Sequence, residues 1–231
     1  MARLAIIPAR GGSKRIPRKN IKSFLGKPII AYSIEAALSS GLFDEAMVST
    51  DDEEIGQIAR EYGAKVPFYR SAVASDDTAT TLDALAEVLA QYGKQDHRFT
   101  EVCCIYPASP FVTAELLQSG YKLLEHEQFD CVFPVLRYGS PIQRSMVLGP
   151  DGRMQLRYPE YVSTRSQDLE PSYHDAGMFY WFRPEPVLTA RKLWTDNSGC
   201  LEVSELQAQD IDTPADWQLA EFKYQYLQQH G

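Results

Sequence analysis

The sequence predicts an α/β fold in which a mostly parallel sheet is covered by helices on both faces. Short apolar runs alternate with segments of helical periodicity through most of the chain, an order typical of strands joined by crossover helices. The first apolar run, Leu4 to Pro8, leads directly into a glycine pair and a cluster of cations. This is the arrangement with which α/β sheets bind phosphate groups. At 231 residues and 44% apolar composition, one domain with a full core is expected.

Each element follows from hydrophobic spacing and from helix end signals. Continuous apolar runs predict buried strands, and apolar residues three and four apart predict helices. Pro28 and the acidic turn after Asp52 are typical of helix starts. The expected order is a strand over Arg3–Pro8, a helix over Pro28–Ser39, a strand over Ala46–Ser49, a helix over Asp52–Tyr62, a short strand over Lys65–Tyr69, a helix over Thr78–Tyr92, a strand over Val102–Tyr106, a helix over Thr113–Glu125, strands over Cys131–Val135 and Met178–Phe182, and a final helix over Pro214–Gln228.

The alternation breaks between Arg137 and Ser172, where the chain is polar and rich in proline and glycine. Pro150-Asp151-Gly152 is turn chemistry, so a hairpin over Met146–Tyr158 is expected. We interpret residues 137–172 as an active-site flap or a dimer contact, inserted into a single domain that spans residues 1–231.

Composition excludes several classes of protein. The net charge of −8 argues against a general binder of nucleic acids or acidic membranes. No stretch is apolar for long enough to cross a bilayer, and no signal-peptide pattern opens the chain, so a cytoplasmic protein is expected. The cysteines lack C-x-x-C spacing and are interpreted as buried, reduced thiols; they are Cys103, Cys104, Cys131 and Cys200.

Positive charge is concentrated near the start of this acidic chain. The first 34 residues contain eight Lys or Arg and no Asp or Glu, and five of these cations lie between Ala9 and Asn20. Neither a Walker A motif nor G-x-G-x-x-G is present. Gly11 and Gly12 allow the backbone to approach a ligand, and five cations suit a triphosphate better than a dinucleotide. A solvated turn is the plain alternative, which the lack of nearby acids disfavours.

The segment Ile7-Pro8-Ala9-Arg10-Gly11-Gly12-Ser13-Lys14-Arg15-Ile16-Pro17-Arg18-Lys19-Asn20 closely resembles the opening signature of the CMP-sugar synthetases for nonulosonic acids. The likeness continues through residues 28–30, 48–55, 70–76 and 210–214. It implies a three-layer α/β/α, Rossmann-like fold of nucleotide-diphospho-sugar transferases and a homodimer formed through residues 137–172. It also implies transfer of CMP from CTP to the anomeric hydroxyl of an acidic nine-carbon sugar, with release of pyrophosphate.

The resemblance implies a set of nucleotide contacts, in which Arg10 and Lys14 also act catalytically by stabilising phosphate charge. For Arg15 and Arg18, phosphate contact and an exposed loop position stay open. The implied nucleotide-binding residues are Arg10, Gly11, Gly12, Ser13, Lys14, Lys19, Asn20, Arg70 and Thr81.

Two carboxylates near the C-terminus form a candidate Mg²⁺ site. Asp210 and Asp212 are two apart, so in an extended segment they point to the same side. Mg²⁺ takes one or two protein carboxylates and completes its shell with water and phosphate oxygens. In the resembling family this Asp-x-Asp binds the metal, and we count Asp212 among the catalytic residues. Thr213 and Asp216 are interpreted instead as a helix cap, and the acidic run 51–54 as a complement to a helix dipole.

The sugar contacts are suggested by departures from the sialic acid enzymes. Tyr106 stands where those enzymes carry a glutamine, and the segment from Tyr173 and His174 to Gly177 precedes an aromatic strand; both features look most like the pseudaminic acid branch. Arg165 resembles an arginine that the family uses near the sugar, where it can hold a carboxylate by two hydrogen bonds. A surface arginine is the alternative. Tyr106, Arg165, Tyr173 and His174 are the expected sugar contacts, and none is assigned as the general base.

Three rival functions remain open at this stage. A sialic or legionaminic acid cytidylyltransferase differs only in the acceptor sugar. A non-catalytic nucleotide-binding regulator would bind CTP without turnover, although the presence of both Asp210 and Asp212 argues against it. A NAD-binding Rossmann enzyme would not need a charge cluster of triphosphate size.

Overall fold

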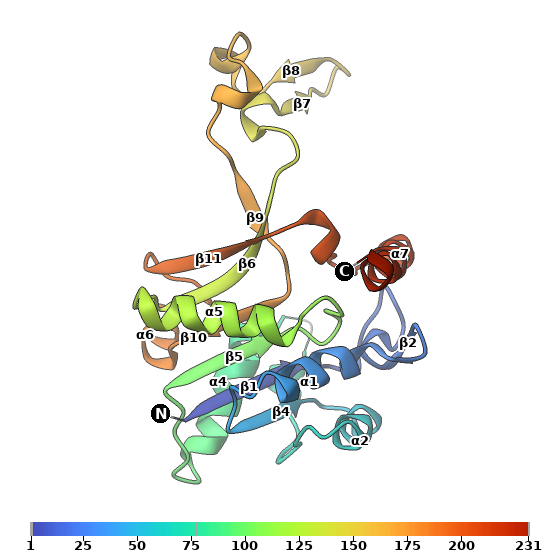
Figure 1. Ribbon diagram of the computed structural model, residues 1–231, viewed down its shortest axis with the longest axis vertical. Helices are drawn as coiled ribbons and strands as arrows, with labels where there is room; N and C mark the ends of the chain where they lie inside the picture. Colours follow the sequence, from blue (N-terminus) through green and yellow to red (C-terminus); the bar gives the residue numbers. More distant parts are fainter. Residues whose placement is uncertain (1, 77, 231) are drawn as a thin grey trace.

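The computed structural model describes residues 2–76 and 78–230. In this part of the chain, a seven-stranded sheet has the order β11-β6-β10-β5-β1-β4, and β9 pairs with β6 (Figure 1). Its strands are β1 (Arg3–Pro8), β4 (Glu45–Ser49), β5 (Glu101–Ile105), β6 (Cys131–Arg137), β9 (Tyr173–Asp175), β10 (Phe179–Phe182) and β11 (Ser198–Val203). The helices are α1 (Ile29–Ser39), α2 (Glu53–Glu61), α3 (Ala72–Ser75), α4 (Thr81–Gly93), α5 (Ala114–His126), α6 (Pro184–Ala190) and α7 (Pro214–His230). Two small hairpins pair β2 (Ser23–Phe24) with β3 (Lys27–Pro28), and β7 (Met146–Leu148) with β8 (Met154–Leu156).

Strand direction brings several loops to one edge of the sheet. β1 runs parallel to β4 and β5, so the carboxyl ends of these three strands open on the same edge. β10 is antiparallel to both of its neighbours, β5 and β6. The residues that precede β10 therefore reach the edge at which β1 and β5 end.

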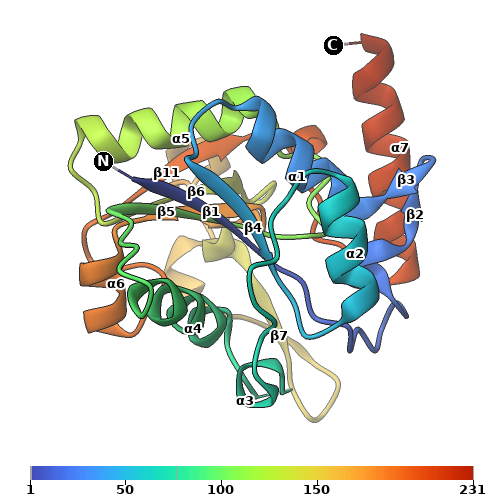
Figure 2. The same cartoon turned by 90° about the horizontal axis from the view of Figure 1, so that it is seen from below.

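The two faces of the sheet are covered by different helices, as Figure 2 shows from below. Alternation along β1 sends Leu4 and Ile6 into a cluster with Leu85 and Val88 of α4. Ala5 and Ile7 join the larger cluster with α1, α2, α5 and α7. Because successive side chains of a strand point to opposite faces, one short apolar run supplies both cores. The expected three-layer α/β/α fold is confirmed.

Most predicted elements are confirmed, two expectations need correction, and several elements were not expected. The short strand over 65–69 is wrong: only Lys65 bridges to Met47 of β4, since Pro67 cannot continue a ladder. The helix expected from residue 78 begins at Thr81, because Thr80 forms a capping box with Asp83. The elements β9, β11 and α6 were not expected.

The cysteines and the C-terminal helix cap also have clear outcomes. Cys103, Cys104 and Cys131 are buried, but Cys200 is an exposed free thiol on β11, so the expectation of four buried thiols is wrong. The predicted cap before α7 is confirmed, because the Thr213 backbone N–H donates to the Asp216 carboxylate over 2.7 Å.

Residues 138–172 form an arm that projects from the sheet between β6 and β9 (Figure 1). The hairpin expected there is present as β7 and β8, with Leu148 paired to Met154. Large apolar side chains on the arm are exposed, among them Met146, Leu148 and Val162. Within residues 2–76 and 78–230, no helix combines the length and the apolar composition that a bilayer span requires.

Candidate active site

Two cavities adjoin at the edge of the sheet where β1 and β5 end. The phosphate loop, residues 9–20, leaves β1 here. One cavity, of about 390 Å³, is lined by Pro8, Arg10, Ser13, Lys14, Arg15, Ile16, Lys19, Asn20, Pro107 and Asp212. The other, of about 240 Å³, is lined by Pro8, Arg10, Arg70, Ala74, Asp76, Ala79, Thr80, Thr81, Ala84 and Tyr106. Pro8 and Arg10 belong to both, so the cavities meet at Arg10.

The larger cavity is strongly basic. Arg10, Lys14, Arg15 and Lys19 all line it, and Asn20 is held in place because its side-chain amide donates to the Arg10 carbonyl over 3.0 Å. A pocket lined by several cations and little opposing charge attracts polyphosphate. Most of the predicted nucleotide contacts are therefore brought together on one side of Arg10.

The smaller cavity brings together Arg70, Thr81 and Tyr106. The mostly buried Arg70 guanidinium donates to the Ser49 carbonyl at 2.5 Å and to its hydroxyl at 3.1 Å, and burial lowers the pKa of Arg70. The Tyr106 and Thr81 hydroxyl oxygens lie 3.5 Å apart. Burial raises the pKa of Tyr106, so its phenol stays protonated at neutral pH. Tyr106, expected at the sugar, thus lies beside residues expected at the nucleotide.

Of the aspartate pair, Asp212 lines the larger cavity, whereas Asp210 lines neither cavity. Asp212 forms ion pairs with Arg15 at 2.8 Å and with Lys19 at 3.5 Å. Burial, and then the charge of Asp212, raise the pKa of Asp210. Two neighbouring carboxylates, one of them with a raised pKa, fit a hard divalent cation that supplies positive charge. Among the described residues no cluster of three or more candidate metal ligands occurs, so Mg²⁺ at this pair would also need phosphate and water oxygens.

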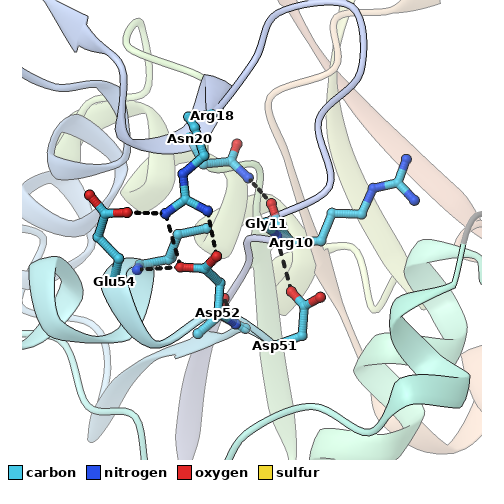
Figure 3. Close-up of polar contacts among 9 residues, drawn as sticks. Arg10, Gly11, Arg18, Asn20, Asp51, Asp52 and Glu54 are labelled. Carbon is cyan, nitrogen blue, oxygen red and sulfur yellow. Dashed lines mark hydrogen bonds and ion pairs between the residues drawn. The ribbon is translucent and has the colours of Figure 1, made fainter.

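The acidic run after β4 fastens the phosphate loop (Figure 3). The Gly11 N–H donates to Asp51 over 3.0 Å, and the Arg18 guanidinium contacts the carboxylates of both Asp52 and Glu54. Asp52 also caps α2 by accepting from the Ile55 N–H, which confirms the structural interpretation of this run. Of the two arginines left open, Arg15 lines the larger cavity, whereas Arg18 lines neither cavity.

The remaining predicted sugar contacts do not gather at these cavities. Tyr173 and His174 are exposed on β9, where the His174 ring packs 4.9 Å from the Tyr138 ring. Arg165 is exposed on the arm and lines neither cavity. Within one chain, Tyr106 alone of the four lines either cavity.

Sequence reasoning missed a polar link beside Tyr106. The Tyr106 and Tyr180 rings lie 5.5 Å apart, and the Tyr180 hydroxyl donates to the Asp175 carboxylate. That carboxylate also accepts from the Gly177 N–H over 2.8 Å. The aromatic run of β10 was the only sequence signal for this link, because Asp175 and Tyr106 are far apart along the chain.

Comparison with known proteins agrees with this geometry. The cytidylyltransferase family profile matches residues 4–167. The chain is 41% identical to a pseudaminic acid cytidylyltransferase of Campylobacter jejuni, over 97% of each protein. It is 32% identical to a CMP-N,N'-diacetyllegionaminic acid synthase of Legionella pneumophila, over 94% of each. In fold it resembles a CMP:2-keto-3-deoxy-manno-octonic acid synthetase solved with CTP, with a TM-score of 0.70, 18% identity, and coverage of 99% of this chain and 100% of that one.

Proposed function

Because this chain belongs to the cytidylyltransferase family, we propose that it transfers CMP from CTP to the anomeric hydroxyl of pseudaminic acid and releases pyrophosphate. The observation that carries this proposal is the junction of the two cavities at Arg10. The basic cavity suits the triphosphate, and the smaller cavity beside Arg70 and Thr81 suits the nucleoside. Arg10 then lies where the two parts of one nucleotide meet.

The reaction needs charge stabilisation more than covalent chemistry. The anomeric hydroxyl loses its proton to water or to a phosphate oxygen, its oxygen forms a bond to the α-phosphorus, and the bond from this phosphorus to the bridging oxygen of pyrophosphate breaks. Negative charge grows on the phosphoryl and leaving-group oxygens. Arg10 and Lys14 are proposed to stabilise this charge, because cations in a preorganised cavity act more strongly than in water. Ser13, Lys19 and Asn20, with the backbone of Gly12, are proposed to hold the phosphates. Because the Gly11 N–H donates to Asp51, Gly11 is proposed to lie beside the phosphates without donating to them.

Mg²⁺ is proposed to bind at Asp210 and Asp212, where it would orient the triphosphate and offset the charge of the leaving group. In the nucleotide-free protein, Arg15 and Lys19 neutralise Asp212. A triphosphate would compete for these cations and so release the Asp212 carboxylate. The raised pKa of Asp210 supports this proposal, because a divalent cation would offset the burial and the neighbouring charge of Asp212 that disfavour its carboxylate form.

We propose that acceptor recognition involves a second copy of the chain. Tyr106 can reach the acceptor from the nucleotide side, and Tyr173 and His174 lie at the base of the arm. Arg165 lies on the arm, away from its own chain's cavities, so it would act at the site of a partner. The exposed apolar side chains of the arm support a homodimer through residues 137–172, because patches of this kind mark protein interfaces.

The same proposal covers domain organisation and location. The arm is treated as an insertion within one catalytic domain over residues 1–231. A cytoplasmic location fits the four free cysteines, because thiols stay reduced there, and it fits a nucleoside triphosphate substrate.

The decisive assay is CTP-dependent pyrophosphate release with pseudaminic, legionaminic and N-acetylneuraminic acids. The proposal is supported if pseudaminic acid gives pyrophosphate release at a lower sugar concentration than the other two acids. Preference for another acid would instead indicate a cytidylyltransferase for that acid. Binding of CTP with no release for any acid would instead favour a regulator. Asp212→Asn should lower release by at least about 100-fold, as expected when several kcal/mol of metal-assisted stabilisation are lost. Unchanged release at limiting Mg²⁺ would remove Asp212 from the metal site.

A further inference from the structure

We propose that Arg18 is a positioning residue for nucleotidyl transfer, which holds the phosphate loop against the start of α2 through Asp52 and Glu54. This inference depends on the proposed function only for the identity of the ligand, CTP. Arg18 belongs to the basic cluster of the sequence, yet it lines neither cavity of the site. Its charge is directed away from the cavities, toward two carboxylates of a neighbouring element.

The contact made by Arg18 has the geometry of a strong ion pair. One guanidinium nitrogen contacts Asp52 Oδ2, and the other lies 3.1 Å from Asp52 Oδ1 while also contacting Glu54. Such bidentate pairing fixes both distance and orientation. The Arg18 hydrogen bond lowers the pKa of Asp52, so Asp52 is a carboxylate throughout the neutral range. The carboxylate in turn is fixed to α2 by the Ile55 N–H at 3.0 Å.

The backbone of Arg18 shows that the loop is held in an uncommon conformation. Arg18 has φ of 54°, in the left-handed region, where non-glycine residues are rarely found. It stands immediately before the short 3-10 helix Lys19–Ile21. A residue stays in such a conformation when surrounding contacts over-determine it. The conformation also sets the direction in which Lys19, the next residue, enters the larger cavity.

A second tether holds the opposite end of the loop to the same acidic run. The Gly11 N–H donates to Asp51, and a Cβ added at Gly11 would lie 2.7 Å from Asp52 Oδ2. The loop therefore touches residues 51 and 52 directly at Gly11 and again through Arg18. Lys14 lies between these two anchoring points, and Arg10 immediately precedes the first of them.

Electrostatics explains why it is useful for Arg18, Asp52 and Glu54 to hold the loop; we call this set of contacts the clamp. The loop concentrates five cations in twelve residues, and their mutual repulsion favours an open loop until an anion binds. The acids after β4 lie outside the cavity, so they can restrain the loop without neutralising the phosphate-binding side. A loop that is already closed loses less conformational freedom when the nucleotide binds. The clamp should therefore act on CTP binding more than on acceptor binding.

The test compares Arg18→Gln and Asp52→Asn with a matched control. Asparagine is as good a helix cap as aspartate, so Asp52→Asn weakens the ion pair while keeping the start of α2. Arg60→Gln removes an exposed arginine of α2 that contacts Tyr69 rather than the loop. The measurements are KM for CTP, KM for the sugar, kcat, and hydrogen exchange of the backbone amides of residues 9–20 with and without CTP.

We expect Arg18→Gln and Asp52→Asn each to raise KM for CTP about tenfold, the size of a lost charged hydrogen bond in a partly exposed site. KM for the sugar should change less than about twofold, since the acceptor does not pay the ordering cost of the loop. Exchange of the loop amides should become faster, and saturating CTP should slow it again. The double variant should be little worse than either single variant, because both remove one interaction. Arg60→Gln should match the wild type.

Three results would overturn the inference. The first is a KM for CTP and a loop exchange rate that stay at wild-type values in Arg18→Gln. The second is an equal fall in thermal stability and kcat with no selective change in KM for CTP, which would make Arg18 merely structural. The third is full additivity of the two substitutions. If Arg18→Gln does not fold, Arg18→Lys keeps one ion pair and should give a smaller change in the same direction; wild-type behaviour there also refutes the clamp. Hydrogen exchange of the loop amides without ligand tests the contact of Arg18 with Asp52 independently of CTP. If the wild-type protein shows no response to CTP, that result counts against the proposed function and not against this contact.

Discussion

Replacing Gly11 by alanine should destabilise the nucleotide-free protein, whereas the same replacement at Gly12 should not. A Cβ at Gly11 would lie 2.7 Å from Asp52 Oδ2 and 3.1 Å from Asp52 Cβ. A Cβ at Gly12 would meet nothing within 4 Å. The two glycines are adjacent and have the same intrinsic preferences, so the pair isolates the effect of the contact with Asp52.

The size of the effect follows from what holds Asp52. Its carboxylate accepts from the Ile55 N–H at 3.0 Å and from Arg18, so it cannot turn away without losing these bonds. Losing a helix cap costs roughly 0.5–2 kcal/mol, and forcing an extra methyl group into a packed site costs roughly 1–3 kcal/mol. We therefore expect a loss of about 1–2 kcal/mol in the free energy of unfolding. For a chain of this size, that loss lowers Tm by about 2–8 °C.

The assay is thermal and urea unfolding of wild type, Gly11→Ala and Gly12→Ala without nucleotide. Equal stability of the two variants would refute the reasoning, because only one of them meets a neighbour. In an Asp52→Ala background the two nearest carboxyl atoms are removed, so Gly11→Ala should there cost less than in the wild type. Gly12→Ala should leave the stability without CTP unchanged and should raise KM for CTP, since Gly12 is proposed to face the phosphates.

Three further predictions concern the metal pair, the sugar and the arm. Burial and the charge of Asp212 raise the pKa of Asp210 in the folded state. The folded protein therefore binds this proton more tightly than the unfolded chain and loses stability as pH rises through the aspartate range. Asp210→Asn should raise Tm near neutral pH, leave Tm unchanged in acid, and abolish most Mg²⁺-dependent turnover. Arg165→Ala should raise KM for the sugar about tenfold and leave KM for CTP near wild type, as expected for loss of a charged contact to a carboxylate; equal changes in both constants would contradict that role. Leu148→Glu places a charge on the exposed apolar face of the arm and should convert the proposed dimer to a monomer in sedimentation, whereas an unchanged sedimentation coefficient would count against an interface on the arm.

The gathering of the basic residues at one edge of the sheet could be predicted because their signal is local in sequence. The cations of residues 10–19 and the glycine pair lie in one segment after β1, and strand order alone carries that segment to the sheet edge. The role of Arg18 could not be predicted in the same way. Its partners belong to the neighbouring strand and helix, and only the register that pairs Pro8 with Ser49 brings them into contact.

The expected sugar contacts could not be predicted as one site, because the structure separates them within one chain. Arg165, Tyr173 and Tyr106 come from the arm, from β9 and from the end of β5, and no periodicity in the sequence relates these elements. The short strand β11 also escaped prediction, since its sequence of Ser, Gly, Cys, Leu, Glu and Val mixes polar and apolar residues at an exposed position.

The reversed direction of β10 has a consequence for how such enzymes can diversify. Because β10 enters the sheet from the edge where β1 and β5 end, the arm is inserted into the chain beside the two cavities, and its stem of β6 and β9 does not interrupt the central strands. Amino-acid replacements along this appendage can accumulate with little penalty to the machinery that handles the donor. Related enzymes could therefore keep the cavities proposed for CTP and change their acceptor sugar through substitutions in the arm, without a change in the sheet.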